Sequence, residues 1–258
     1  MKTVIIADVH GRDLWKQIVA QESDADMFVF LGDYFDSFDI SGTVQLQNFL
    51  DIVAFKESGE KQVVMLIGNH DVHYFPHSED SATSGYQAIM APTYKYAVDQ
   101  HKHNMQIAFK LGEFVFTHAG ISSEWMDDHF VGWNKDNMVD LINERFDYKP
   151  NDLNYRSFKY YNYGDPNERA TLSAGFGGET YQGPLWIRPK ALMSANKDTL
   201  RKEIIQVVGH THQNEIDKKG TATGGRYYFT DVQETSEEYM IITDGNITFN
   251  NTKQKQKL

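Results

Sequence analysis

Cysteine is absent from this chain of 258 residues, and its absence narrows the available chemistry. Disulfides, thiolate metal sites and cysteine nucleophiles are all excluded. A bound metal would have to be held by histidine, aspartate, glutamate, asparagine or water. Any metal site in this protein must therefore use nitrogen and oxygen ligands.

Long hydrophobic runs are also missing. No apolar run approaches the roughly 18 residues of a membrane-spanning helix. The segment "VIIA" near the N-terminus is too short for the core of a signal peptide and leads straight into an acidic residue. We therefore expect a cytoplasmic protein that does not act at a membrane.

Basic residues are outnumbered by acidic ones. The chain has 25 lysines and arginines against 36 acidic residues, a formal net charge of −11. Such a charge repels nucleic acids and phosphorylated substrates unless cations or a local basic patch compensate. Bound divalent metals would supply that compensation locally, and nucleic acid is not an expected partner.

No linker rich in proline, glycine or serine divides the chain, so we predict one domain over residues 1–250. Residues 147–184 have little helical or strand periodicity, and we predict a lid-like insertion there because such long loops are usually functional or disordered. A surface excursion without function is the alternative. Residues 251–258 are predicted to be a polar tail.

Short β-branched or aromatic runs alternate with helical patterns in the first part of the chain. Leu46, Phe49, Leu50 and Val53 form an amphipathic stripe with helical spacing. The order strand, helix, strand, helix, strand predicts right-handed βαβ crossovers and a parallel sheet. The expected strands are 3–7, 27–31 and 62–67, and the expected helices are 13–21 and 42–56.

Further strand patterns follow, and they look more antiparallel. Residues 107–111 and 113–118 are predicted to form a hairpin around Leu111 and Gly112. The whole pattern indicates an α/β fold with mixed sheets. The remaining expected strands are 203–209, 225–232, 237–243 and 246–250.

Five of the predicted strands end in side chains that can bind metals. In open α/β sheets, ligands bind beyond the carboxyl ends of the strands, so we expect these five segments to converge on one site. The candidate ligands, in chain order, are Asp8, His10, Asp33, Asn69, His118, His210 and His212.

The spacing within this set favours chelation. Asp8 and His10 lie two residues apart on an extended segment, so their side chains leave the same face, and so do those of His210 and His212. Seven nitrogen and oxygen ligands are too many for one tetrahedral zinc but suit two divalent metals that share a carboxylate. We expect Asp33 to be the bridging ligand.

Each of these residues taken alone has an ordinary structural explanation. Asp8 or Asp33 could cap a helix or form an Asx-turn. Five separate strand ends with ligand-type residues make a joint coincidence improbable. Glycines that precede three of the ligands fit close backbone approach to a site. No role at the site is expected for the other histidines, which are His73, His77, His101, His103 and His129.

The motifs "DVHG", "GDYFD", "GNHD", "THAG" and "GHTH" occur in this order between residues 8 and 212. Together they resemble the metallophosphoesterase superfamily, the calcineurin-like phosphoesterases. "GDYFD", "THAG" and "PLWIRP" look most like the branch that contains serine/threonine phosphoprotein phosphatases and symmetrical dinucleoside tetraphosphate hydrolases. The resemblance implies a two-layered β-sandwich of mixed sheets flanked by helices, with two metal ions, most often manganese and otherwise iron or zinc.

The resemblance also implies roles for individual residues. His70 would be the general acid that protonates the leaving oxygen, and Asp36 the carboxylate that keeps His70 protonated. Asn69 would contact substrate as well as metal. The nucleophile would be a hydroxide that bridges the metals and attacks phosphorus in line. The implied ligand sets are Asp8, His10, Asp33 and His212 for one metal, and Asp33, Asn69, His118 and His210 for the other.

One position departs from the family pattern. Phosphoprotein phosphatases usually have an arginine after the second aspartate of "GDYFD", where it binds the phosphate, but this chain has Ser37. Arg188 resembles another family position that contacts phosphate, and it is the best substitute. The alternative for Arg188 is a surface arginine beside Pro189.

These observations predict a metal-dependent phosphomonoesterase that acts on phosphorylated proteins at serine or threonine, or on a small phosphorylated substrate. A nucleotide pyrophosphatase or phosphodiesterase, such as a symmetrical dinucleoside tetraphosphate hydrolase, is the second reading. A catalytically silent scaffold is the third, and it predicts broken ligand positions. None of the seven positions is broken. The oligomeric state stays open.

Overall fold

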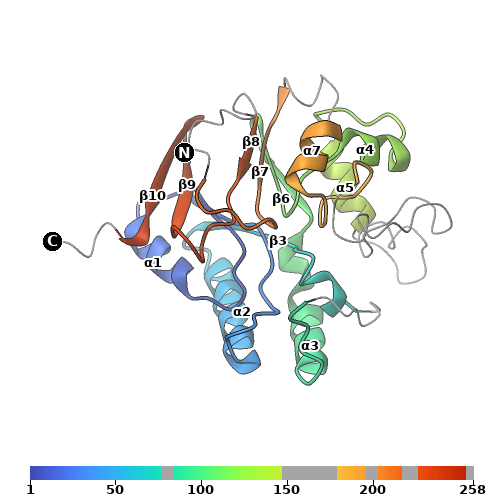
Figure 1. Ribbon diagram of the computed structural model, residues 1–258. Coiled ribbons are helices and arrows are strands. Elements are labelled where there is room, and N and C mark those ends of the chain that lie inside the picture. Colours follow the sequence, from blue (N-terminus) through green and yellow to red (C-terminus); the bar gives the residue numbers. More distant parts are fainter. Residues whose placement is uncertain (77–83, 147–178, 196–202, 217–225, 254–258) are drawn as a thin grey trace.

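The computed structural model describes residues 1–76, 84–146, 179–195, 203–216 and 226–253. Their strands form two sheets that pack against each other (Figure 1). The six-stranded sheet has the order β10-β9-β1-β2-β3-β4, and the four-stranded sheet has the order β5-β6-β7-β8. The strands are β1 Lys2–Ile6, β2 Met27–Phe30, β3 Gln62–Leu66, β4 Met105–Gln106, β5 Ala108–Leu111, β6 Phe114–Thr117, β7 Ile205–Val208, β8 Tyr227–Phe229, β9 Glu238–Thr243 and β10 Asn246–Asn251.

Both sheets are mixed. Strands β1 to β4 pair in parallel, while β9 and β10 are antiparallel additions. In the other sheet β5 and β6 form the predicted hairpin, but β6, β7 and β8 are parallel to one another. The expectation of a more antiparallel second half is therefore wrong for β6 to β8. Parallel neighbours of this kind need crossover connections rather than tight turns.

Helices cover the outer faces of the sandwich (Figure 1). Helices α1, α2 and α3 pack on the six-stranded sheet, and α4, α5 and α7 lie beside the four-stranded sheet. The predicted two-layered architecture with flanking helices is confirmed. The helices are α1 Leu14–Gln21, α2 Gly42–Glu57, α3 Ala91–His101, α4 Ser123–His129, α5 Met138–Phe146 and α7 Pro189–Ala195, with short 3-10 turns η1 Val72–Tyr74 and η2 Lys102–Asn104.

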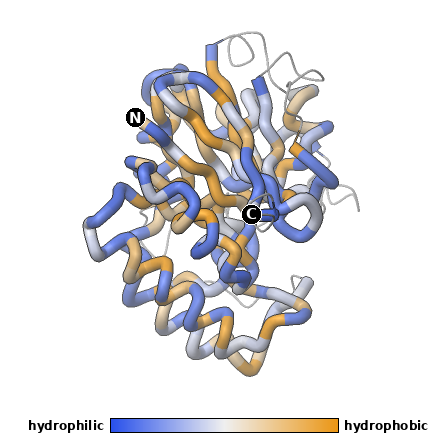
Figure 2. Tube along the Cα trace, turned by 90° about the vertical axis from the view of Figure 1, so that its left-hand side faces the viewer, coloured by the Kyte–Doolittle hydropathy of each residue, from blue (hydrophilic) through white to orange (hydrophobic). Residues whose placement is uncertain are grey.

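The central strands are buried on both faces, which explains their unbroken apolar sequences. Ile5 of β1 and Val29 of β2 point into the sandwich, where they meet Phe116 and other residues of the second sheet. Their neighbours Val4 and Phe28 point the opposite way, towards the helices. Hydrophobic residues accordingly dominate these strands, whereas hydrophobic and hydrophilic residues alternate along the helices (Figure 2).

Helix α2 shows how the amphipathic stripe works. Phe49 and Val53 are buried against the six-stranded sheet, and Leu46 and Leu50 pack against the same cluster from partly exposed positions. Complete burial of a side chain of this size contributes about 1.5–3 kcal/mol relative to exposure. The predicted helix over residues 42–56 is confirmed with one further residue at its end.

The topology brings several strand ends together. Because β1, β2 and β3 are parallel, they end at the same edge of the sheet. The same holds for β6, β7 and β8 in the second sheet. The loops after these strands carry the residues described below.

The predicted insertion at 147–184 lies outside the described residues except for residues 179–184. At the other end of the chain, β10 continues to Asn251 and Thr252 is buried, while residues 254–258 lie outside the described part. Among the described helices, none is long and apolar enough to cross a membrane.

Candidate functional site

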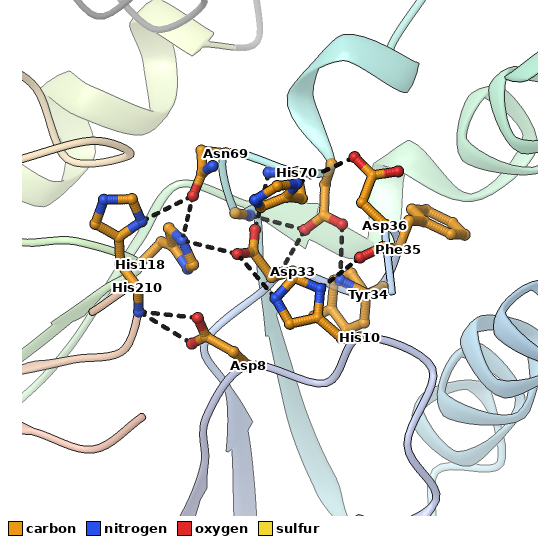
Figure 3. Close-up of polar contacts among 12 residues, drawn as sticks. Asp8, His10, Asp33, Tyr34, Phe35, Asp36, Asn69, His70, His118 and His210 are labelled. Carbon is orange, nitrogen blue, oxygen red and sulfur yellow. Dashed lines mark hydrogen bonds and ion pairs between the residues drawn. The ribbon is translucent and has the colours of Figure 1, made fainter. Parts of the chain in front are cut away.

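Polar side chains from several strand ends meet at one point between the two sheets (Figure 3). Asp8 follows β1, Asp33 follows β2 and His118 follows β6. Their ligand atoms all lie within 4.8 Å of one another, and all three residues are buried. Burying two carboxylates side by side is costly unless positive charge compensates, so this cluster favours cations.

Asn69 and His210 extend the cluster. The Asn69 Oδ1 atom lies 2.8 Å from Nε2 of His118 and 2.8 Å from Nδ1 of His210. Nε2 of His118 is also 3.3 Å from Oδ2 of Asp33. The backbone N–H of His210 donates to the Asp8 carboxylate at 3.0 Å. Loops after β3 and β7 thus converge on the same point as those after β1, β2 and β6.

Backbone carbonyls orient three of the histidine rings. A ring nitrogen that contacts a carbonyl is fixed as the donor, so the opposite nitrogen keeps its lone pair for a metal. His10 also places Nε2 3.6 Å from Oδ2 of Asp33. The carbonyl contacts are His10 Nδ1 to Phe35 O at 2.6 Å, His118 Nδ1 to Leu31 O at 2.9 Å, and His210 Nε2 to Trp186 O at 3.0 Å.

The backbone is strained at the same place. Six non-glycine residues in the described part of the chain have φ in the left-handed region, and four of them belong to this site. This conformation is uncommon for non-glycine residues and is often found at functional sites. The four residues are His10 (φ 43°), Asp33 (φ 53°), Asp36 (φ 66°) and His210 (φ 63°).

Two glycines let the carboxylates approach the backbone, as the sequence predicts. A Cβ atom on Gly68 would collide with Oδ1 of Asp33, and one on Gly209 would collide with Oδ1 of Asp8. Glycine at these positions therefore removes a steric obstacle to the cluster.

Asp71 holds the loops after β2 and β3 together, a role that was not predicted from the sequence. Its Oδ2 accepts hydrogen bonds from the backbone N–H groups of Asp33 and Gly68, both at 2.8 Å. Its Oδ1 accepts one from the N–H of Tyr34 at 2.8 Å. Burial and the neighbouring Asp33 raise the pKa of Asp71 to about 8, a shift that bound cations would oppose.

The electrostatics of the cluster also favour positive charge. Burial raises the pKa of Asp8 well above its usual value, and Asp231 adds to this effect. Burial would lower the pKa of His118, but Asp33 and Asp8 raise it to about 10. The negative charge of Asp33 and Asp8 that raises the pKa of His118 would also attract a metal cation. The buried oxygen and nitrogen donors fit divalent metal ions.

His70 lies beside the cluster. Its backbone N–H donates to Oδ1 of Asp33 at 2.9 Å. Its Nδ1 is 3.1 Å from Oδ2 of Asp36. Burial lowers the pKa of His70, but Asp33 and Asp36 more than compensate and raise it above its usual value. The structure therefore brings together the two residues expected to handle the proton.

His212 and Arg188 lie at the rim. The side chain of His212 is exposed, and the structure does not place it in the group formed by Asp8, Asp33 and His118. Arg188 is half-buried, with Nη1 3.3 Å from the hydroxyl of Thr211. Asp8 and Asp33 attract its charge, which puts Arg188 within electrostatic reach of the cluster.

Asp231, which follows β8, was missed in the sequence. Burial raises its pKa to about 6, and it interacts electrostatically with His212 and Asp33. An acid after a strand is the same signal that identifies Asp8 and Asp33. The predicted strand over residues 225–232 includes Asp231, so Asp231 was placed inside a strand and was not recognised as a residue that follows one.

Ser37 forms part of a turn. It is buried, its hydroxyl donates to Oδ1 of Asp39 at 2.7 Å, and it accepts from the N–H of Ile40 at 3.3 Å. Its own N–H donates to Oε1 of Gln45 at 3.2 Å. These contacts stabilise the loop between β2 and α2 and give the position a structural role.

His73 differs from expectation. No role at the site was predicted for it, but it is buried and its Nε2 lies 3.0 Å from Oδ2 of Asp36. The spacing of three residues from His70 is a signal that could have found it, because residues three apart share one side of a helical turn. Of the other histidines without a predicted role, His77 lies outside the described residues.

Comparisons with known proteins agree with this geometry. The family model of calcineurin-like phosphoesterases matches residues 1–214. A comparison with curated protein sequences finds no match.

Solved structures share the fold at low sequence identity. The chain is similar to the cold-active protein-tyrosine phosphatase of a psychrophile, Shewanella sp., with a TM-score of 0.66, 19% identity and coverage of 97% of this chain and 78% of that one. It is also similar to a protein serine/threonine phosphatase from Saccharomyces cerevisiae with similarity to human phosphatase PP5. There the TM-score is 0.54, the identity 13%, and the coverage 97% of this chain and 79% of that one.

Members of the matched family typically bind two divalent metals. The family model covers more than four fifths of the chain, and the buried Asp and His donors that it leads us to expect lie together in the structure. The chain therefore belongs to the calcineurin-like phosphoesterases and is a metal-dependent phosphoesterase.

Proposed function

We propose that this protein is a phosphomonoesterase that removes phosphate from serine or threonine of phosphorylated proteins, with two manganese ions as cofactors. The observation that carries the proposal is the contact between His70 and Asp36 beside the metal-type cluster. Serine and threonine leave as alkoxides and need a proton, which an imidazole held by a carboxylate can donate. The phosphate groups of a dinucleoside tetraphosphate leave more readily and need such an acid less.

Asp8, His10, Asp33, Asn69, His118, His210 and His212 are the proposed metal ligands. When bound there, two divalent ions would supply a hydroxide nucleophile at neutral pH and neutralise the charge of the phosphoryl group. The protein itself contributes by holding the ligand side chains in fixed positions. The backbone N–H of His70 donates to the Asp33 carboxylate, and the backbone N–H of Asp33 donates to Asp71. The carbonyl contacts fix the histidine rings.

His70 performs the proton step in this proposal. Its Nδ1 faces Asp36, which leaves Nε2 to donate to the leaving oxygen as the bond from phosphorus to that oxygen breaks. The raised pKa of His70 supports this role, because the imidazole must carry its proton before the reaction.

Arg188 is the proposed phosphate-binding residue. Its guanidinium stays charged at neutral pH, although burial lowers its pKa from the ordinary value. Replacement with lysine keeps the charge but removes the bidentate fork, and replacement with alanine removes both. We expect KM to rise in both variants, and more in the alanine variant.

One observation favours nucleotide hydrolysis as a second candidate. Ser37 occupies the position where phosphoprotein phosphatases usually have arginine, and its hydroxyl is used in a turn. A phosphoprotein substrate would therefore lose one of its usual contacts. The second candidate is a pyrophosphatase or phosphodiesterase acting on compounds such as dinucleoside tetraphosphates.

Steady-state hydrolysis by the manganese-loaded protein separates the two candidates. The substrates are a phosphoserine peptide, a phosphotyrosine peptide, p-nitrophenyl phosphate, its bis-ester and diadenosine tetraphosphate. We expect manganese-dependent turnover of the phosphoserine peptide and the monoester, with little turnover of the bis-ester or tetraphosphate. Preference for the tetraphosphate or the bis-ester would overturn the proposal in favour of the second candidate.

A variant tests the proton step. His70→Asn should bind manganese as the original protein does, while turnover of the phosphoserine peptide falls by about 100-fold or more. Turnover of p-nitrophenyl phosphate, whose leaving group needs little protonation, should fall far less. Full activity of the variant on the phosphoserine peptide would remove His70 from the mechanism.

A further inference from the structure

The Asp36 carboxylate has more partners than the support of one histidine requires. It is 1% exposed, and its Oδ2 lies 3.1 Å from Nδ1 of His70 and 3.0 Å from Nε2 of His73. Its other oxygen, Oδ1, accepts a hydrogen bond from the hydroxyl of Tyr74 at 2.5 Å. Both carboxylate oxygens are therefore engaged, and one is shared by two imidazoles.

One short segment supplies all three partners of Asp36. His70 follows β3, and His73 and Tyr74 belong to η1, which begins two residues later. A helical turn places side chains three and four residues apart on one side, so the sequence "HDVHY" directs these three side chains towards the same carboxylate. The acid and the other two partners of Asp36 thus lie on one continuous stretch of chain.

Packing holds the η1 residues in place. The Tyr74 ring lies 5.3 Å from the ring of Phe35 and 5.0 Å from that of Tyr94, measured between centroids. His73 lies edge-on to Tyr86 at 5.1 Å. Tyr74 is 0% exposed and His73 is 1% exposed, so neither side chain can turn away without disturbing the core.

These contacts act on the orientation of Asp36. A carboxylate with one partner can rotate about its terminal bond, and the distance to that partner then varies. Asp36 also has a left-handed backbone with φ of 66°, which is uncommon for a non-glycine residue, so the surrounding structure must hold it. Contacts to both oxygens from a packed turn restrict the rotation.

We propose that His73 and Tyr74 are positioning residues that hold the Asp36 carboxylate in the orientation in which it supports His70. The inference rests on the proposed role of His70 as the general acid. The proton moves from His70 to the leaving oxygen as the bond from phosphorus to that oxygen breaks. The attacking water supplies the oxygen that replaces it on phosphorus. The proton that this water loses when it becomes hydroxide restores His70 over the cycle. His73 and Tyr74 exchange no proton with the substrate and keep the distance between Asp36 and His70 short.

Three variants test this, with one matched control. Tyr74→Phe removes only the hydroxyl, which donates to Asp36 and also accepts a hydrogen bond from the backbone N–H of Gln87 at 3.4 Å, and His73→Leu removes the imidazole. His73→Gln restores an amide nitrogen at a similar reach. The control is Tyr94→Phe, because Tyr94 is buried in the same aromatic cluster and its hydroxyl bonds the carbonyl of Gly42 at 2.9 Å instead of the Asp36 carboxylate.

The assay compares kcat on an alkyl phosphate with kcat on p-nitrophenyl phosphate, at saturating manganese. A weakened acid affects poor leaving groups selectively, whereas damage to the metal site or to the fold affects both substrates equally. We expect His73→Leu and Tyr74→Phe to lower kcat on the alkyl phosphate by about 10-fold or more, with a change below about 3-fold on p-nitrophenyl phosphate. His73→Gln should recover part of the loss, and Tyr94→Phe should show no selective effect.

Two readouts besides activity complete the test. Manganese binding by each variant should match that of the original protein, and a crystal structure of His73→Leu combined with Tyr74→Phe should show the Asp36 carboxylate rotated away from His70. An unchanged Asp36 orientation, or an equal loss on both substrates, would overturn the inference. If His70→Asn itself shows no selective loss, the proposed acid role is wrong; if it does but the η1 variants do not, only the positioning role is wrong.

Discussion

Replacement of Asp71 with asparagine tests a residue that holds the metal ligands in place but is not itself a proposed ligand. Asp71 is 0% exposed and accepts three backbone hydrogen bonds, from Asp33, Gly68 and Tyr34. An amide has only one acceptor oxygen. In the better of its two orientations it keeps the bonds from Asp33 and Gly68 and turns its NH₂ group towards the N–H of Tyr34.

The structure sets the size of the effect. One buried N–H loses its acceptor in this variant, and such a loss costs about 1–3 kcal/mol of folding free energy. Asp33 is a proposed ligand with a left-handed backbone, so a looser loop should also weaken metal binding. Removal of a residue that orients metal ligands typically costs about 10- to 100-fold in affinity.

Two measurements check this expectation. Urea denaturation of the metal-stripped protein should show a lower midpoint with an unchanged slope, and calorimetric titration should show weaker manganese binding. The matched control is Glu22→Gln. Glu22 is also buried and accepts hydrogen bonds from Tyr239 at 2.6 Å and Asn250 at 2.8 Å, but it contacts no proposed ligand. The Glu22→Gln protein should be less stable than the original protein and should keep its affinity for manganese. An Asp71→Asn protein with the original midpoint and affinity would refute the reasoning.

Three further changes have definite expected outcomes. Asp33→Asn should lose manganese and activity together, because the proposed bridge is removed; metal analysis and the hydrolysis assay check it, and full activity on an alkyl phosphate would contradict it. Gly68→Ala should weaken metal binding in calorimetry, because its Cβ would collide with Asp33; unchanged affinity would show that the loop can shift. For Glu22, burial raises the pKa, but hydrogen bonds led by Lys2 lower it overall. Its contribution to stability is therefore present above the unfolded-state pKa of about 4.5 and is lost as the pH falls through the lower folded-state value. Glu22→Gln should remove this part of the acid dependence in urea titrations, and an identical pH profile would contradict it.

The fold was predictable where local pattern and burial agree. The runs around Val4, Phe28 and Val63 are buried on both faces, so they read as continuous apolar strands and pair in parallel as expected. The parallel pairing of β6 with β7, and of β7 with β8, was not predictable in this way. It depends on where a long connection brings the chain back, and the alternation of residues along a strand does not record the direction of its neighbours.

The candidate site was likewise predictable from the sequence only in part. Asp8, Asp33 and His118 could be placed together because each follows a strand, and parallel strands end at one edge. Asp71, His73 and Tyr74 follow no strand directly, and they act through contacts to other site residues. Such partners become visible only when the turn that carries them is folded. The cytoplasmic location, the lid-like insertion, the tail boundary and the individual ligand assignments stay predictions.

The most direct test of the central claim is the metal centre itself. Metal-stripped protein should be titrated with manganese and followed by electron paramagnetic resonance. Two ions that share the Asp33 carboxylate would be magnetically coupled, so we predict about two equivalents bound per chain and a coupled spectrum that appears as activity does. Binding of a single equivalent with the spectrum of an isolated manganese ion, or full activity without metal, would contradict the account.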